Sequence, residues 1–279
     1  MTWWVPLFRG TQRTSGAAGR RRPGSGRAGV VAAVSVALVV FCPSLALAAP
    51  GDLDTLFDTD GKVTTDFGGN DVAFAMASQP DGKIIAAGRS GGDFVLARYN
   101  GDGSLDATFD TDGRVSTDFT GGGDEAHGVA LQPDGKIVAA GATGPGFNFG
   151  LARYNSDGSL DTSFDTDGKV STDFGDIDVA QAVVMQADGK IVTAGRSGSS
   201  FALARYNADG SLDTSFDSDG KVISGFGAGV AAVAVALQPD GRIIAAGEAV
   251  VDGQPDGDFG LPVTTATAVW TPPSAPAAQ

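Results

Sequence analysis

Aspartate recurs in this chain in the pattern LDxxFDxDGxV, and carboxylates at a fixed spacing could bind a metal ion or act as acid and base. Each of four copies supplies three aspartates: Asp54, Asp58 and Asp60; Asp106, Asp110 and Asp112; Asp161, Asp165 and Asp167; Asp213, Asp217 and Asp219. These are the candidate metal ligands, and calcium is the metal that prefers such oxygen ligands. Asp-Gly pairs are first of all turn formers, so the sequence favours a turn over a metal site.

A helix–loop–helix calcium site is excluded by the residues at its obligatory positions. With Gly168 at the sixth position of the loop, the first position holds Ser163. The twelfth position needs a bidentate glutamate and holds Phe174. A looser site built from the three carboxylates of one copy remains the alternative to the turn.

Residues for enzymatic catalysis are scarce in the rest of the chain. His127 is the single histidine, and the equivalent positions of the other copies hold Phe74, Gln181 and Val233. The GxSxG, HExxH and P-loop patterns do not occur. Carboxylates that recur in every copy indicate a structural role rather than glycoside hydrolysis. We therefore expect no catalytic residues and no enzymatic activity.

The aspartates belong to an internal repeat that begins at Gly51. The LDxxFDxDGxV pattern opens at Leu53, Leu105, Leu160 and Leu212. Each copy continues with TDF or a variant and a QPDGKI-like segment, and three copies close with LARYN. A period of about 50 residues indicates a propeller, a solenoid or an array. We place the copies at about 51–102, 103–157, 158–209 and 210–261.

Each copy contains four segments with the composition of β-strands, separated by turn residues. In the first copy these segments are 62–67, 72–78, 83–90 and 94–100. In QPDG, proline sets φ at the first central position of a hairpin turn and Gly82 takes the left-handed position. Four-stranded sheets packed face to face form a β-propeller. The sequence therefore predicts an all-β, β-propeller-like array of about four four-stranded blades, the last one incomplete.

Aromatic and arginine residues recur together with the aspartates. The recurring phenylalanine and tyrosine residues indicate contacts between blades, with a carbohydrate-stacking strip as the alternative. Arg98, Arg153 and Arg205 are expected to pair with a repeated aspartate. The aspartates that we consider for this pairing are Asp66, Asp118 and Asp173.

The first 48 residues have the layout of a secretory signal peptide. Arginines without any acidic residue precede an apolar run, which ends in a small-x-small site at Ala46–Ala48. An uncleaved anchor is the alternative, because about 20 apolar residues can span a bilayer. We expect cleavage after Ala48, which leaves no membrane span and places the mature protein outside the cell or on its surface.

Without this segment the chain is strongly acidic and contains no cysteine. The whole chain has 19 lysine and arginine residues and 33 aspartate and glutamate residues, and removal of the six arginines of the segment leaves a formal charge of −20. Such a surface repels nucleic acid. The single cysteine, Cys42, lies within the apolar run. Disulfides and thiol chemistry are therefore not expected in the mature protein.

The blocks LDTSFDTDGKVSTDFG, QPDGKIVAAG and FALARYNADGSLD resemble the delta-60 repeat, a tandem repeat of exported bacterial proteins. The resemblance covers roughly residues 51–261 and implies an exported, β-propeller-like scaffold without assigned catalytic residues. The steps between the copies are 52 to 55 residues rather than nearer sixty. The fourth copy loses its last block to a divergent, Pro/Ala-rich tail at 262–279.

Two functions are consistent with these features. The first is an exported, non-enzymatic scaffold without a cofactor, whose longer loops at 141–150 and 247–260 bind a protein or a glycan. The alternative is a calcium-binding surface module that uses the FDxDG loops, and its stability would depend on the metal. The sequence does not identify the partner.

Overall fold

All regular structure is β-strand in the residues that the computed structural model describes, which are 51–119, 121–225, 231–249, 258–260 and 262–264. Within this part of the chain, no helix is long and apolar enough to cross a membrane. The predicted signal peptide (1–48), with Cys42, and most of the predicted tail (262–279) lie outside the described residues.

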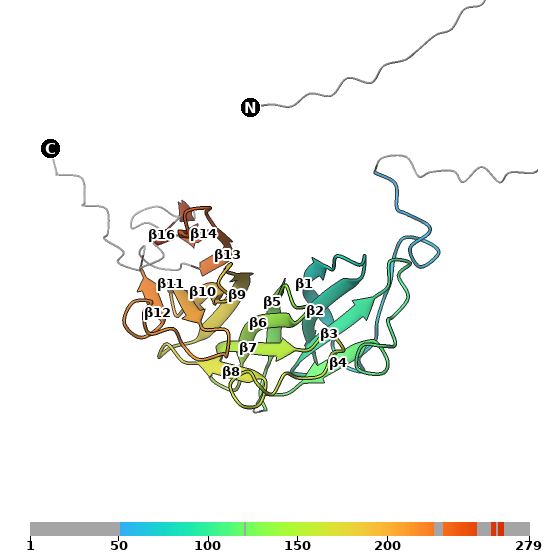
Figure 1. Cartoon of the computed structure of the whole chain (residues 1–279), viewed down its shortest axis with the longest axis horizontal. Coiled ribbons are helices and arrows are strands. Elements are labelled where there is room, and N and C mark those ends of the chain that lie inside the picture. The colour runs from blue at the N-terminus through green and yellow to red at the C-terminus, as the bar shows by residue number, and fades with distance from the viewer. Residues whose placement is uncertain (1–50, 120, 226–230, 250–257, 261, 265–279) are drawn as a thin grey trace, which may run out of the picture. The chain divides into compact units, whose positions relative to one another are not determined.

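The strands form four antiparallel sheets, which confirms the predicted all-β, propeller-like array (Figure 1). The first sheet contains β1 (Val72–Ser78), β2 (Ile84–Ser90), β3 (Asp93–Tyr99) and β4 (Arg114–Thr117). The second contains β5 (Glu125–Leu131), β6 (Ile137–Thr143), β7 (Asn148–Tyr154) and β8 (Lys169–Thr172). The third contains β9 (Asp178–Met185), β10 (Ile191–Ser197), β11 (Ser200–Tyr206) and β12 (Lys221–Ser224). The fourth contains β13 (Ala231–Leu237), β14 (Ile243–Ala249), β15 (Asp258–Gly260) and β16 (Val263–Thr264).

The fourth strand of each of the first three sheets comes from the next repeat, which differs from the predicted grouping. β4 lies in the second copy of the repeat but pairs with β3 of the first copy, with Leu96 opposite Val115. Residues 62–67, predicted as the first strand of the first sheet, do not form a strand. The equivalent segments of the later copies, such as β4, pair with the third strand of the preceding sheet. The described residues contain no sheet before the first one, so 62–67 has no such strand to pair with.

The QPDG turns form as the sequence predicts. In the first copy the N–H of Gln79 donates to the carbonyl of Lys83 at 2.8 Å, and the N–H of Gly82 donates to the carbonyl of Gln79 at 3.0 Å. Gly82 has a φ of 86°, which glycine adopts without strain. These turns fix the antiparallel register of the first two strands of each sheet.

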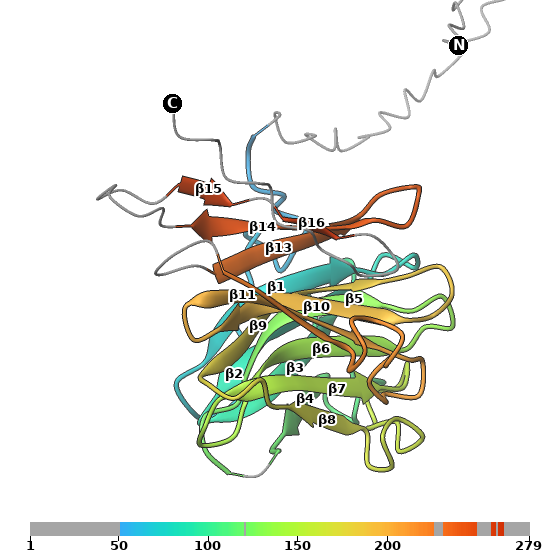
Figure 2. The ribbon, with the colours of Figure 1, turned by 90° about the vertical axis from the view of Figure 1, so that its left-hand side faces the viewer.

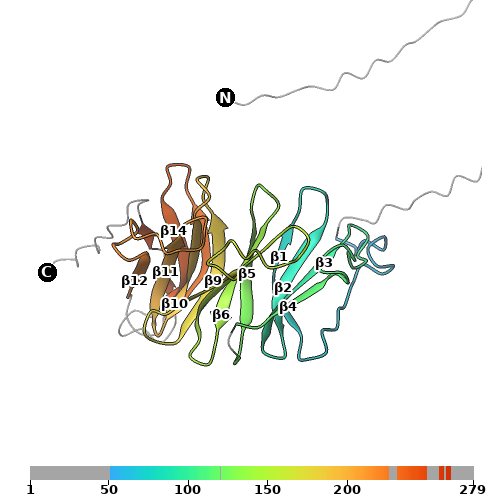
Figure 3. The ribbon, with the colours of Figure 1, turned by 60° about the horizontal axis from the view of Figure 1, so that its bottom comes forward.

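The sheets pack against one another in chain order (Figure 2, Figure 3). Their first strands, β1, β5, β9 and β13, contact each other in succession. Between the first two sheets, Phe94 and Leu96 share a buried cluster with Ile137 and Tyr154. Among the described residues the row of sheets does not close into a ring.

A β-bulge occurs in the first strand of every sheet, where the backbone of that strand lies close to a glycine of the second strand. The carbonyl oxygen of Val72 lies 1.8 Å from the position of a Cβ on Gly88, so only glycine fits there. Gly141, Gly195 and Gly247 have the same close approach. The bulge leaves one residue of each first strand without a partner opposite: Phe74, His127, Gln181 and Val233.

Candidate functional site

We call the segment LDxxFDxDG of each copy its FDxDG loop. In three copies the first of its three aspartates, the one that follows the leucine, is buried and forms ion pairs. Asp106 is 4% exposed, and its Oδ2 accepts hydrogen bonds from Arg98 Nε at 2.7 Å and from Lys83 Nζ at 2.8 Å. Its Oδ1 accepts the N–H of Thr108 at 3.1 Å and the hydroxyl at 2.7 Å. The same arrangement joins Asp161 to Arg153 and Lys136, and Asp213 to Arg205 and Lys190.

The recurring arginines pair with a repeated aspartate, as predicted, but the aspartates considered for this pairing were wrong. They pair with Asp106, Asp161 and Asp213 instead of Asp66, Asp118 and Asp173. The physical reason is a backbone contact: the N–H of Asp161 donates to the carbonyl of Arg153 at 2.9 Å, which returns the loop to β7. The Arg153 guanidinium also lies 4.5 Å from the ring centroid of Phe164 and donates to the carbonyl of Ala208 in the next copy.

The second and third aspartates of these loops shape the turn itself. Asp165 has a φ of 44°, and its N–H donates to the carbonyl of Asp209 at 2.8 Å. The Oδ1 of Asp167 accepts the N–H of Lys169 at 2.9 Å. Positive φ recurs at Asp58, Asp110 and Asp217, and the side-chain contact recurs at Asp60, Asp112 and Asp219.

In the first copy, Asp54 is exposed and accepts the N–H of Leu56 at 3.0 Å. The trio to which it belongs is not brought together as a carboxylate cluster, and neither are the other three trios within the described part of the chain.

The ion pairs perturb the acidity of the buried carboxyls. Burial by itself raises the pKa of Asp106. Hydrogen bonds from Lys83 and Thr108 and the charge of Arg98 outweigh it and hold the pKa well below its ordinary value. The pKa of Asp213 is lowered to about 2, because Ser215, Lys190 and Arg205 outweigh the effect of burial. These carboxylates are charged at neutral pH and already engaged by protein donors.

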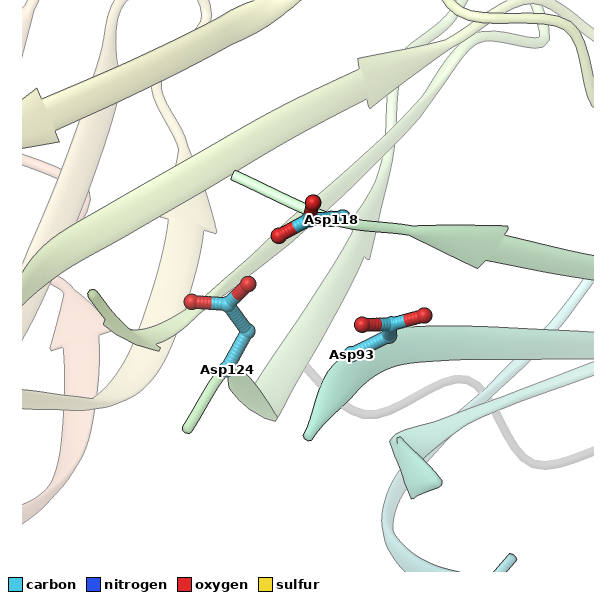
Figure 4. Close-up of side chains that lie close together, drawn as sticks. All are labelled: Asp93, Asp118 and Asp124. Atoms are coloured by element: carbon cyan, nitrogen blue, oxygen red, sulfur yellow. The ribbon is translucent and has the colours of Figure 1, made fainter. Parts of the chain in front are cut away.

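A different set of aspartates, Asp93, Asp118 and Asp124, does gather into one group (Figure 4). One carboxylate oxygen from each lies within 4.8 Å of the others, between the first two sheets. Such oxygens are suitable ligands for a hard cation. The buried Asp124, however, accepts the N–H of Phe119 at 3.0 Å and the N–H of Gly144 at 2.8 Å. Asp124 therefore anchors the turn that follows β6.

That turn forms one wall of a hollow of 370 Å³ between the second and third sheets, which we call the loop-end hollow. Its lining residues are Glu125, His127, Ala142, Phe147, Ile177, Val179, Gln181 and Arg196. Phe147 has a φ of 54°, and its carbonyl accepts the N–H of Asp178 at 2.7 Å, so the loop of one sheet is tied to the next. The predicted binding loop at 141–150 therefore contributes to a concave surface. The other predicted loop, 247–260, lies partly outside the described residues.

Polar side chains converge on the floor of the loop-end hollow. His127 Nε2 lies 3.2 Å from Glu125 Oε2, and Arg89 donates to the other oxygen of Glu125. The imidazole is also 4.6 Å from the ring of Phe74, measured between centroids. Burial lowers the pKa of His127 and Arg89 lowers it further, against the opposing effect of Glu125. The imidazole is therefore neutral at pH 7, with one donor and one acceptor nitrogen.

The sequence interpretation missed this group, because it treated His127 as a residue at a variable strand position. His127 and Gln181 are the bulged residues of β5 and β9. Bulges often occur beside binding sites, where they redirect a side chain. The available signal was the variation itself: the repeat places four different side chains at this position.

A second hollow, of 660 Å³, lies at the opposite end of the first strands, and we call it the turn-end groove. The QPDG-type turns of the second, third and fourth sheets form it, with Leu131, Met185 and Leu237 among its lining residues. The Oε1 atoms of Gln132, Gln186 and Gln238 are buried here without a partner in the described residues. Because these groups repeat in every copy, they belong to the common architecture of the blade.

Solved structures with a similar fold share little sequence with the chain. A catalytically inactive variant of virginiamycin B lyase from Staphylococcus aureus, solved with quinupristin, is 12% identical with a TM-score of 0.44. The match covers 71% of this chain and 57% of the lyase. An engineered GH43 glycoside hydrolase with endo-xylanase and exo-arabinofuranosidase activity is 12% identical with a TM-score of 0.38, covering 68% of this chain and 36% of that one. The chain thus spans little more than half of the lyase.

The prediction that the chain is not an enzyme was wrong, because structures of similar fold include a lyase and a glycoside hydrolase. The prediction rested on short motifs such as GxSxG. Motifs of this kind cannot reveal a site that collects single residues from several sheets, as the loop-end hollow does.

No curated protein sequence matches the chain. A family model does: the domain of unknown function DUF5122, described as a β-propeller, matches residues 79–109, 132–164, 186–216 and 238–258. Each of the first three matches runs from the QPDG-type turn to the phenylalanine of the FDxDG loop, so it spans the second and third strands of a sheet. The resemblance to the delta-60 repeat is thereby supported in its coarser form: four segments of this chain match the β-propeller repeat DUF5122.

Proposed function

We propose that this protein is an exported β-propeller repeat scaffold that binds a saccharide in the loop-end hollow. The observation that carries the proposal is the bulged position of the first strands. Core residues such as Phe94 recur in the next two copies, as Phe149 and Phe201. The bulged residues instead differ in all four copies: Phe74, His127, Gln181 and Val233. A repeated scaffold whose side chain differs at the bulged position of each blade is suited to selective recognition.

The chemistry of the hollow suits a ligand with many hydroxyl groups. A sugar hydroxyl both donates and accepts hydrogen bonds, and the hollow offers both kinds of partner. The amide of Gln181 and the neutral imidazole of His127 supply donors and acceptors, Glu125 accepts, and Arg196 donates. Phe147 and Ile177 provide apolar surface for the ring carbons. The volume of 370 Å³ lies in the range of about 300–1,000 Å³ that is typical of small-ligand sites.

Export is proposed on separate grounds, namely the arginine-rich and apolar layout of residues 1–48. A protein outside the cell or on its surface meets polysaccharides and glycoproteins. The two parts of the proposal can be tested independently. Fractionation of the producing cells, with detection of the chain in the medium and the envelope, tests the first part; retention of the protein in the cytosol would contradict it.

The binding part is tested by screening the purified chain against an array of neutral and acidic saccharides. We expect a saccharide to bind, and Gln181→Ala and Arg196→Ala to weaken binding of that saccharide about tenfold or more, because each removes a half-buried hydrogen-bond partner. The matched control is Gln186→Ala, which changes the same residue type in the turn that follows the same strand. If Gln186→Ala weakens binding and Gln181→Ala does not, the result contradicts the proposed site. No binding on the array would contradict the function.

A further inference from the structure

The outer face of the first sheet exposes residues that are buried in every other sheet. Ala73 is exposed, whereas its equivalents Ala126, Ala180 and Ala232 are 0% exposed. Met76 is 65% exposed, whereas its equivalent Val183 is 8% exposed. In the second, third and fourth sheets, this face packs against the preceding sheet. We call this exposed surface of the first sheet the accepting face, because the same surface of the other three sheets packs against the preceding sheet.

The segment 62–67 completes this accepting face, because it is already placed as its equivalents are. The hydroxyls of Thr65 and Tyr99 are 2.7 Å apart, and the equivalent bonds join Tyr154 to Thr117 and Tyr206 to Thr172, each at 2.9 Å. In those copies the threonine also pairs with the third strand of the preceding sheet, as Thr117 does with Phe94. Thr65 has no such strand among the described residues.

A groove of 380 Å³ lies on this face of the first sheet, where the preceding sheet packs in the other copies. It is lined by Val63, Thr65, Phe67, Ala73 and Tyr99, among others. The equivalents of Phe67 contact a phenylalanine of the preceding sheet: Phe119 lies 4.9 Å from Phe94 and Phe174 lies 4.8 Å from Phe149, between ring centroids. The groove is therefore shaped for a sheet that carries a phenylalanine in its third strand.

The fourth sheet exposes the opposite face, which in the other three sheets packs against the following sheet. Ile244 and Ala246 are half-buried, whereas their equivalents Val192 and Ala194 are 0% exposed, between the third and fourth sheets. β15 lies at the edge of its sheet in the described residues, and Phe259 pairs with Glu248 as Phe94 pairs with Arg89. Phe259 thus holds the sequence position that Phe94, Phe149 and Phe201 hold in the first three sheets.

We propose that two copies of this chain associate head to tail, with the fourth sheet of one copy packed on the first sheet of the other. The segment 62–65 of one copy then forms the fourth strand beside β15 of its partner. The register follows from the internal pairs Phe94 with Thr117, Phe149 with Thr172 and Phe201 with Ser224, and places Thr65 opposite Phe259. Such a contact is heterologous, so it either closes a ring or continues as a filament. A closed ring of two copies contains eight sheets, which is within the usual range for propellers.

The first test is the mass of the purified chain in solution, measured by light scattering over a range of protein concentrations. We expect a dimer or a larger assembly, and we expect Met76→Asp to shift it to the monomer. The control is Ile223→Asp, because Ile223 is 54% exposed on the outer strand of the third sheet, away from both halves of the interface. Both variants retain the fold, since both side chains are exposed. A monomeric wild type, or an assembly that Met76→Asp leaves unchanged, overturns the proposal.

The second test distinguishes association between copies from closure within one copy. Thr64→Cys and Gly260→Cys are made separately in a Cys42→Ser background, because the register places residues 64 and 260 opposite each other. We expect a disulfide-linked dimer when the two single variants are mixed and oxidised, and not with either variant alone. Failure of the mixture to cross-link overturns the proposal. A third variant carries both cysteines in one chain, and a disulfide that forms only within that chain also overturns the proposal.

Discussion

The FDxDG loops lead to a sharp prediction, because the first and third aspartates of one loop have opposite environments. Asp161 is 6% exposed and is held by Arg153 and Lys136, whereas the side chain of Asp167 is 59% exposed. Asp161→Ala leaves the buried guanidinium of Arg153 without its carboxylate and the N–H of Ser163 without its acceptor. Breaking a buried ion pair from one side lowers the free energy of unfolding by about 3–5 kcal/mol.

Asp167→Ala is the matched control within the same loop. It removes one hydrogen bond, from the N–H of Lys169, and its effect on the free energy of unfolding is about 1 kcal/mol or less. The two variants should therefore differ by about 2–4 kcal/mol in urea unfolding followed by circular dichroism. Each measurement is repeated with calcium and with a chelator, and we expect no change.

Calcium binding at these loops predicts a different pattern. Both aspartates would then be ligands, so both variants would lose a stabilisation that only calcium provides. Equal effects of Asp161→Ala and Asp167→Ala, or a wild type that the chelator destabilises, would refute the reasoning from burial and ion pairs.

Three further predictions concern stability, acidity and metal binding. Because the pKa values of Asp106, Asp161 and Asp213 are lowered below the ordinary 3.8 in the folded state, their contribution to stability is present above that pH and is lost as the pH falls toward about 2. Urea midpoints measured between about pH 5 and about pH 2 should therefore fall less steeply for Asp213→Asn than for the wild type, and equal slopes would contradict this. Gly195→Ala places a Cβ 1.9 Å from the carbonyl oxygen of Val179 and should cost about 1–3 kcal/mol in the same assay, whereas Gly146→Ala, with nothing within 4 Å, should be near neutral. Calorimetric titration with calcium at raised salt should detect no calcium-selective site in the FDxDG loops, since protein donors already engage their buried carboxylates; three or four salt-resistant sites would show the opposite.

The parts of the fold that depend on neighbouring residues could be predicted from the sequence. The turn at Gln79–Gly82 forms because proline and glycine set its dihedral angles locally, whatever the rest of the chain does. The aspartates of the FDxDG loops likewise shape their own turns, as Asp167 does with Lys169. The number of blades could be predicted because each copy repeats the same local signals.

The parts that depend on distant contacts could not be predicted in the same way. Residues 62–67 have the composition of a strand, but strand formation requires an edge to pair with, and for the equivalent β4 that edge belongs to the previous copy. The partner of Arg153 is Asp161 because the loop returns to β7, which composition does not reveal. The loop-end hollow depends on a bulge, and the bulge becomes visible only when the register of β5 and β6 is known.

The most direct test of the proposed function is hydrogen–deuterium exchange of the chain, with and without a saccharide that binds on the array. We predict that bound saccharide slows amide exchange at the loop-end hollow, in residues 142–147 and 177–181, and leaves the turns at 132–135 and 186–189 of the turn-end groove unchanged. Protection of those turns instead, or no protection at either end, would contradict the account.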